Sequence, residues 1–339
     1  MPNVADADTI KRKMGITSYP THEAGGVGWV YMGPDHLEPE LPALEWTELP
    51  EPQVQVSRWL QCSNWAQGME GEIDSSHVSF LHRANKPEHG LPDAFTSYLP
   101  GLIDGAPELT FKETPYGYVA GARRQTDQPG EYFWRVTQWL VPMFSLIANS
   151  SYPRSGRAWV PVDDDHVTTF GYMFNAERPF NDAELAELER GTFFPPRMTP
   201  GAHRLPNGYI IDTFLPDANS GNDYLIDRDA QASDEIYTGI TGIFEQDQAI
   251  TESMGGIVDH EFERLAPSDQ MITNTRRRIL GAIKGMEKNT APPGVRDPEI
   301  YLGARSGHFV TSDDLDWHKA FQSQLDASAN PTGRLRQAA

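Results

Sequence analysis

Between residues 109 and 174, apolar and polar positions alternate in short runs separated by turn signals. Successive side chains of a strand point to opposite faces, so this period-two alternation predicts β-strands. Turn residues such as Gln128-Pro129-Gly130 and Asp163-Asp164-Asp165 close the runs at modest spacing. The pattern predicts an antiparallel meander with one face packed on helices. The clearest strands are expected at 116–122, 132–140, 158–162 and 166–174.

Helical patterns flank this meander. Residues 54–60 predict a strand that leads into a helix, and residues 181–190 predict a short helix with Asn181 as its N-cap and acids in its first turn. Residues 234–265 are expected to be helical. Residues 270–287 predict an amphipathic helix whose basic run is a solvated face. The predicted class is therefore α+β, an antiparallel β-sheet covered by helices.

The remaining stretches lack a regular period. Residues 1–27 are polar and irregular, and 28–33 alternate weakly like a strand. Residues 34–53 are dense in proline, which breaks helix and sheet alike and predicts a crossing linker. Residues 85–107 are rich in Pro and Gly and predict a loop, a candidate cover for a pocket. We expect irregular structure in 191–233 and a tail after Ala291.

Composition narrows the classes of protein. The 339 residues are 38% hydrophobic and 10% aromatic, enough for one large domain or two ordinary ones. The net charge of −20 argues against nucleic acid or an anionic membrane as partner. It is compatible with docking of a basic electron-transfer protein, although acidic chains are more often simply soluble. Without an N-terminal apolar region or a long apolar run, a cytoplasmic enzyme is expected.

The chain has one cysteine, Cys62. An internal disulfide is therefore impossible, and so is an iron–sulfur cluster held by four cysteines or by two cysteines and two histidines. The simplest interpretation of Cys62 is a small core residue.

Metal chemistry is indicated by residues 64–82, NWAQGMEGEIDSSHVSFLH. Imidazole is a common ligand of transition metals, and two histidines with one carboxylate form the facial triad of non-haem Fe(II) oxygenases. His77 and His82, however, are five residues apart, which places them roughly 140° apart on a regular helix. They meet one ion only if the helix bends or loosens into a π-bulge. On spacing alone, a cap and a core histidine are the commoner interpretation.

A carboxylate for such a triad is available in residues 242–257, GIFEQDQAITESMGGI. Glu245, Asp247 and Glu252 are all candidates. Asp247 lies near the apolar face, whereas Glu245 and Glu252 are expected to face solvent. Periodicity alone does not choose among the three.

The 64–82 segment resembles the signature N-W-x-Q-x-x-E-G-x-x-D-x-S-H-x-x-F-L-H of Rieske non-haem iron oxygenase α subunits, in the branch of phthalate 4,5-dioxygenase and biaryl O-demethylases. The resemblance implies that His77 and His82 bind the mononuclear iron. It also implies that Asp74 bridges to the Rieske cluster of a neighbouring subunit. The matching residues are Asn64, Trp65, Gln67, Glu70, Gly71, Asp74, Ser76, His77, Phe80, Leu81 and His82.

The family pattern also selects the third ligand. Residues 242–257 resemble G-I-x-E-Q-D-x-x-x-x-E-S-M-G-x-I, whose aspartate completes the triad and corresponds to Asp247. Matches at 222–228 and 268–280 extend the resemblance over nearly the whole chain. A plain alternative for Asp74 is an acid stabilised at a helix N-terminus.

Residues 1–34 resemble the end of the family's Rieske domain, through Met1-Pro2-Asn3 and the run from Ile16 to Pro34. The implied organisation is a Rieske remnant at 1–34, a linker at 35–53, a mononuclear-iron catalytic domain at 54–325 and a flexible tail at 326–339. The C-x-H and C-x-x-H motifs of the [2Fe-2S] cluster are absent. A truncated gene, a trimmed chain and a natural short form remain open, and truncation is favoured.

The resemblance implies a helix-grip fold and a terminal oxygenase that uses O2 and electrons from a reductase or ferredoxin. The reaction would be hydroxylation or O-demethylation of an aromatic compound, most simply an aromatic acid, in a homotrimer. Arg123 and Arg124 are candidates to meet a carboxylate, although a surface role is more usual. One rival is a catalytically silent binding or assembly subunit. Another is a zinc hydrolase, for which no general-base motif is present.

Overall fold

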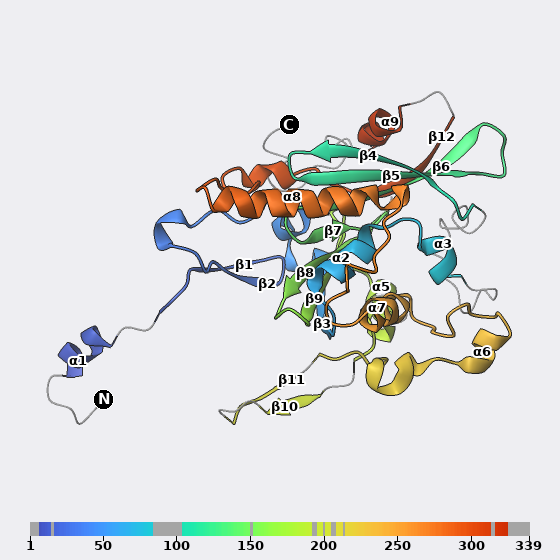
Figure 1. The fold of residues 1–339 in the computed structure, drawn as a ribbon. Coiled ribbons are helices and arrows are strands. Elements are labelled where there is room, and N and C mark those ends of the chain that lie inside the picture. Colours follow the sequence, from blue (N-terminus) through green and yellow to red (C-terminus); the bar gives the residue numbers. More distant parts are fainter. Residues whose placement is uncertain are drawn as a thin grey trace.

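The computed structural model describes residues 7–14, 17–83, 104–149, 152–191, 195–198, 201–204, 208–212, 214–312 and 316–324. At its centre lies an eight-stranded antiparallel sheet of order β3-β9-β8-β7-β6-β5-β4, with β12 paired to β6 (Figure 1). The strands are β3 (Val54–Gln61), β4 (Glu108–Thr114), β5 (Gly117–Gln125), β6 (Glu131–Leu140), β7 (Phe144–Leu146), β8 (Arg154–Pro161), β9 (Val167–Phe174) and β12 (Gly307–Ser312).

The predicted meander is confirmed by β5, β6, β8 and β9, and the predicted strand at 54–60 by β3. Strands β4 and β7 also lie in the stretch 109–174 where short strands were expected, whereas the sequence did not predict β12. Two strands share one edge of β6. Strand β7 pairs with the last residues of β6, from Gln138 to Leu140, and β12 pairs with its first part, from Glu131 to Val136. A partner so distant along the chain leaves no local signal.

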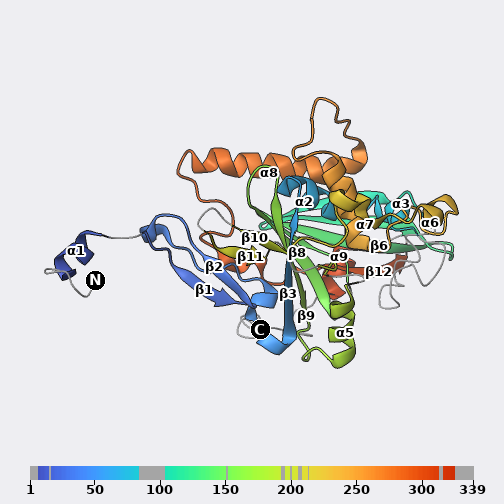
Figure 2. The ribbon, with the colours of Figure 1, turned by 90° about the horizontal axis from the view of Figure 1, so that it is seen from below.

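Helices cover both faces of the sheet, as expected for the α+β class. Along β5, Ala120 packs with α2 and α8 in one core cluster, and its neighbour Val119 packs with α9 in another. Figure 2 shows α8 and α2 on one side of the sheet and α9 on the other. The helices are α1 (Ala7–Lys13), α2 (Trp65–Ile73), α3 (Val78–Leu81), α5 (Asp182–Arg190), α6 (Arg228–Ala232), α7 (Ile243–Ser253), α8 (Gln270–Met286) and α9 (Trp317–Gln324).

Helix α2 packs unusually close to the sheet at Gly68. A Cβ atom at this position would lie 2.2 Å from the Trp159 ring on β8. The side-chain oxygen of Asn64 accepts a hydrogen bond from the Ala66 amide and caps the start of the helix. The metal-motif helix is thus held firmly against the strands that carry the core.

Two helical predictions have different outcomes. The short helix α5 is confirmed, with a capping box in which Asn181 and Glu184 each accept a hydrogen bond from the other's amide. The long helical stretch expected over 234–265 is wrong, because its helix spans only Ile243–Ser253. Gly255 follows with φ +91°, a left-handed conformation that a helix cannot continue through.

The chain from 17 to 53 is more ordered than its sequence indicates. The expectation of irregular structure before residue 28 is wrong for the described residues, which contain α1 and the hairpin of β1 (Thr21–Ala24) and β2 (Val27–Val30). Within the predicted linker, Trp46 is buried and stacks on Tyr172 at 4.6 Å. Three 3-10 helices punctuate it, η1 (Asp35–Leu37), η2 (Glu45–Glu48) and η3 (Glu51–Gln53).

The stretch 191–233, expected to be irregular, holds short elements: β10 (Ala202–Arg204), β11 (Ile210–Asp212), η6 (Ser220–Leu225) and α6. Two further 3-10 helices are η7 (Pro267–Asp269) and η8 (Pro298–Tyr301). Most of the predicted loop at 85–107, and the tail at 326–339, lie outside the described residues. Across the described ranges, no helix has both the length and the apolar character that a membrane crossing requires.

Candidate metal centre

The two motif histidines lie on either side of a break between helices. Helix α2 ends at Ile73, and Asp74 is extended. Its Oδ1 accepts from the Ser76 amide at 2.8 Å and its Oδ2 from the His77 amide at 3.0 Å. The chain then forms α3, with His77 just before it and His82 just after it. Neither the bent helix nor the π-bulge expected from the spacing occurs; the break itself turns both imidazoles inward.

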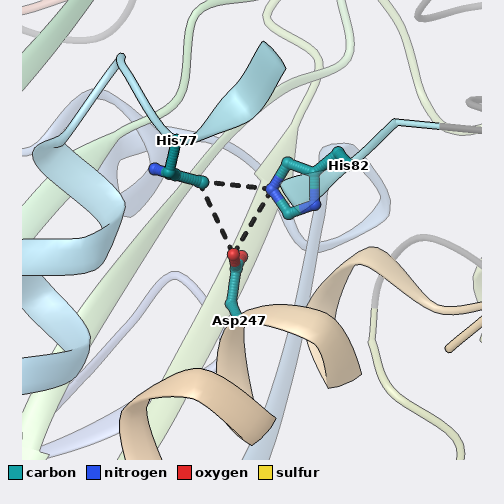
Figure 3. A group of neighbouring side chains, drawn as sticks. All are labelled: His77, His82 and Asp247. Carbon is teal, nitrogen blue, oxygen red and sulfur yellow. Dashed lines mark hydrogen bonds and ion pairs between the residues drawn. The ribbon is translucent and has the colours of Figure 1, made fainter. Parts of the chain in front are cut away.

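Asp247 completes a triangle with these histidines. The Nε2 atoms of His77 and His82 are 3.2 Å apart, and Asp247 Oδ1 lies 3.5 Å from the first and 3.3 Å from the second. Figure 3 shows the three side chains converging. At metal–ligand distances of about 2.1 Å and right angles at the ion, neighbouring ligand atoms are about 3.0 Å apart. The triangle therefore has nearly the size of one face of an octahedron.

The second nitrogen of each imidazole contacts an oxygen outside the triangle. His77 Nδ1 lies 3.2 Å from Asp74 Oδ2, and His82 Nδ1 lies 2.7 Å from Gln246 Oε1. With those Nδ1 atoms as donors, both Nε2 atoms present lone pairs to Asp247. Three electron-pair donors then face one another, an arrangement that a metal cation fits. In the described part of the chain, this is the one group of histidines and carboxylates close enough to hold a metal ion.

The charges at the site are strongly coupled. Burial raises the pKa of Asp247, but the neighbouring His82 and His77 outweigh burial and lower it. Burial lowers the pKa of His82, and the Asp247 carboxylate more than reverses that effect, so the pKa is raised. Burial likewise opposes ionisation of Asp74, yet its hydrogen bond with His77 brings the pKa of Asp74 down to about 2. Both carboxylates are therefore anions, the form in which Asp247 could coordinate a metal and Asp74 accepts its hydrogen bonds.

A cavity of about 260 Å3 opens beside the triad between α2, α7 and α8, lined by His77, Asp247 and Trp159 among others. The cavity wall also contains a buried ion pair between Glu72 and Arg157, which the sequence did not indicate. Burial lowers the pKa of Arg157 to about 9, and its guanidinium lies 3.8 Å from the centre of the Phe244 ring.

Two sheet arginines hold the break between the helices. Arg124 on β5 donates to the Ser75 carbonyl at 2.6 Å, and Arg135 on β6 donates to the Ser75 hydroxyl at 2.9 Å. The expected surface role is wrong for Arg124, which is only 1% exposed. Arg123, the next residue on the strand, points to the other face and pairs with the exposed Glu108. Alternation along β5 separates the two arginines.

The rejected candidates on α7 have other partners. The Glu252 carboxylate accepts hydrogen bonds from the backbone amide of Cys62, the side-chain amide of Gln248 and the hydroxyl of Tyr224. Glu245 is buried, and burial raises its pKa to about 7. The expectation that both glutamates face solvent is therefore wrong, because the loops packed around α7 cover more of its surface than the apolar residues on it indicate.

Sequence comparison places the chain among known proteins. A family model described as "LigXa C-terminal domain like" matches residues 30–334. The 3-chlorobenzoate-3,4-dioxygenase oxygenase subunit of Comamonas testosteroni is 37% identical over 335 residues, which cover 96% of this chain and 75% of that protein. The phthalate 4,5-dioxygenase oxygenase subunit of Pseudomonas putida is 30% identical over 317 residues, covering 92% of this chain and 69% of that protein.

A crystal structure of dicamba monooxygenase bound to dicamba superposes with a TM-score of 0.42 and 13% identity, over 80% of this chain and 70% of that one. Because this similarity is low, the family of the chain is assigned from the sequence relatives. Because a family model spans most of the chain and two relatives share 30% or more of their residues with it, the chain belongs to the Rieske non-haem iron oxygenase family, in the branch of the phthalate 4,5-dioxygenase oxygenase subunits, and is an oxidoreductase.

Proposed function

We propose that His77, His82 and Asp247 hold a mononuclear Fe(II) and that the chain is the catalytic part of a terminal oxygenase. The observation that carries the proposal is the triangle of three ligand atoms, 3.2 to 3.5 Å apart, with both Nδ1 atoms engaged elsewhere. When bound, the iron supplies adjacent open positions at which O2 can react beside a substrate. A silent assembly subunit has no chemical need for all three ligands.

Asp74 has a positioning role in this proposal. It orients His77 through Nδ1 and holds the start of α3 through two backbone amides, so the helix-terminal interactions are compatible with the bridging role that we propose for it. The family uses a Rieske cluster as electron source, and the single cysteine of this chain cannot hold one. We therefore propose that electrons come from a cluster outside these residues, fed by a reductase or ferredoxin, with Asp74 facing it across a subunit junction in a homotrimer.

For the substrate we propose an aromatic acid, hydroxylated or O-demethylated with O2. Two relatives are named for 3-chlorobenzoate and phthalate, both aromatic acids. Arg124 and Arg135 add two buried positive charges on the sheet face beneath the metal motif, and Arg135 also acts electrostatically on His82. A buried guanidinium is the group best suited to a carboxylate.

Iron binding is tested by anaerobic titration of the full chain with Fe(II), with nitric oxide as an O2 surrogate read by EPR. The wild type should give a stoichiometric high-spin iron–nitrosyl signal, which His77→Ala and Asp247→Ala should lose. His260→Ala is the matched control, since this exposed histidine pairs with Glu263 and is not part of the triad. A folded wild type without the signal, or ligand variants that keep it, would overturn the iron site.

The substrate class is tested on the same signal. We expect 3-chlorobenzoate to perturb the nitrosyl spectrum and its methyl ester to leave it unchanged. Arg135→Gln should weaken the acid's effect about 10-fold, because it removes a buried positive charge that acts on the site at His82. Arg123→Gln is the control on the opposite face, and iron affinity is measured in each variant. Equal perturbation by acid and ester would contradict the carboxylate preference.

A further inference from the structure

Gln246 lies between the two metal-ligand elements without being a ligand. It precedes Asp247 on α7 and is 4% exposed. Its Nε2 donates to the Ile240 carbonyl at 2.6 Å, and its Oε1 lies 2.7 Å from His82 Nδ1. A carbonyl only accepts, so the contact with Ile240 identifies the amide nitrogen and leaves the amide oxygen facing His82.

This orientation determines the tautomer of His82. An amide oxygen accepts and cannot donate, so His82 Nδ1 must carry the proton in the short contact. Its Nε2 then presents a lone pair toward Asp247 Oδ1, 3.3 Å away. With the opposite tautomer, the proton would occupy the position that an ion needs.

We propose that Gln246 is a positioning residue that selects the Nδ1–H tautomer of His82 and thereby sets the affinity of the site for iron. The inference rests on the proposed iron site. It makes α7 responsible for two of the three ligands: it carries Asp247 directly and orients His82 through the preceding residue.

The two histidines consequently differ in their support. His77 is oriented by a carboxylate, Asp74, and His82 by a neutral amide. A neutral group at position 246 orients the imidazole without adding a second negative charge beside Asp247. Ligand orientation from outside the coordination sphere typically contributes about 10- to 100-fold to metal affinity.

The test measures Fe(II) affinity anaerobically in the full chain for Gln246→Met, which keeps the volume and removes both hydrogen bonds. Gln138→Met is the matched control, because Gln138 is also buried, accepts from the Tyr116 hydroxyl and donates to the Arg305 carbonyl. We expect Gln246→Met to bind iron about 10- to 100-fold more weakly and Gln138→Met to stay within about threefold of wild type.

Gln246→Glu supplies the conservative rescue. It restores an acceptor for His82 Nδ1 but adds a charge and loses the donor to the Ile240 carbonyl, so affinity should recover only part of the loss seen in Gln246→Met, with altered rhombicity of the nitrosyl EPR signal. Comparable losses in Gln246→Met and Gln138→Met, or wild-type affinity in Gln246→Met, would overturn the role of Gln246 alone. Absence of iron binding by the wild type would instead overturn the metal site itself.

Discussion

Among the places in the described residues where buried or partly buried charged side chains meet from distant parts of the chain, two differ sharply. In the first, Glu45 of η2 meets Arg305 just before β12, and both side chains are 3% exposed. Arg305 donates to both carboxylate oxygens, at 2.8 and 2.5 Å, and the Tyr152 hydroxyl adds a third hydrogen bond. The second place is the triad of His77, His82 and Asp247.

The two places differ in whether hydrogen-bond donors face the carboxylate. At Glu45 each carboxylate oxygen has donors, so the pair is electrostatically complete within the protein. At Asp247, by contrast, each imidazole directs its proton away: Nδ1 donates to Asp74 or Gln246, so the facing Nε2 atoms have no proton to donate to the carboxylate. Uncompensated charge at a partly buried position is costly, so the second arrangement supports the proposed iron site. The first pairing is complete within the protein, whereas the second leaves a position that the proposed ion would complete.

Breaking the complete pair should have the largest effect on stability. Arg305→Met leaves Glu45 buried without its partner, and we expect the free energy of unfolding to fall by about 3–5 kcal/mol in urea denaturation. Glu45→Gln/Arg305→Met should lose less, because no bare charge remains. A single-variant loss below about 1 kcal/mol would contradict the view that this pair is electrostatically self-contained.

Filling the incomplete site should have the next largest effect. A ligand present at about 100 times its Kd stabilises the folded state by about 2.7 kcal/mol. Anaerobic Fe(II) should therefore raise the Tm of the wild type but not that of Asp247→Ala. Arg305→Met should keep the iron-dependent shift despite its lower starting Tm. An equal shift in Asp247→Ala would show that iron binds elsewhere.

A partly exposed ion cluster gives the smallest effect. Arg276 on α8 contacts Glu70 of α2 and Glu263, both through paired hydrogen bonds of 2.6 to 2.7 Å. Since all three groups retain solvent contact, we expect Arg276→Met to cost only about 1 kcal/mol near neutral pH. Arg190→Met, which breaks an exposed pair with Glu187, should change stability by less.

The Arg276 cluster also predicts a pH dependence. The hydrogen bonds between Glu263 and Arg276 lower the pKa of Glu263 from 4.5 to about 2. A depressed carboxyl pKa contributes stability that is present above the unfolded value and is lost as pH falls through the folded value. The difference between wild type and Arg276→Met should therefore shrink between pH 4.5 and about 2. A difference that grows in this window would contradict the assignment.

Much of the fold could be predicted from local patterns. The strands β5, β6, β8 and β9 carry their own alternation, and α5 carries its cap, so each was identified without its neighbours. Strand β12 and the buried Trp46 segment were not, because their order comes from partners far along the chain. The helix expected over 234–265 failed because Gly255 takes φ +91° and ends it, and apolar residues beyond, such as Ile257 and Phe262, are exposed instead of forming one buried helical face.

For the proposed site, the sequence determined the candidates: the family resemblance of residues 64–82 and 242–257 selected His77, His82, Asp74 and Asp247. Only the tertiary structure decided how they meet. Spacing along a regular helix separates the histidines, whereas the break at Asp74, held by two sheet arginines, turns them toward each other. Only packing placed Gln246 against His82, since the register of α7 depends on the whole layer that it packs against. Residue identity sets what a group can bind, but long-range packing sets which groups share one ion.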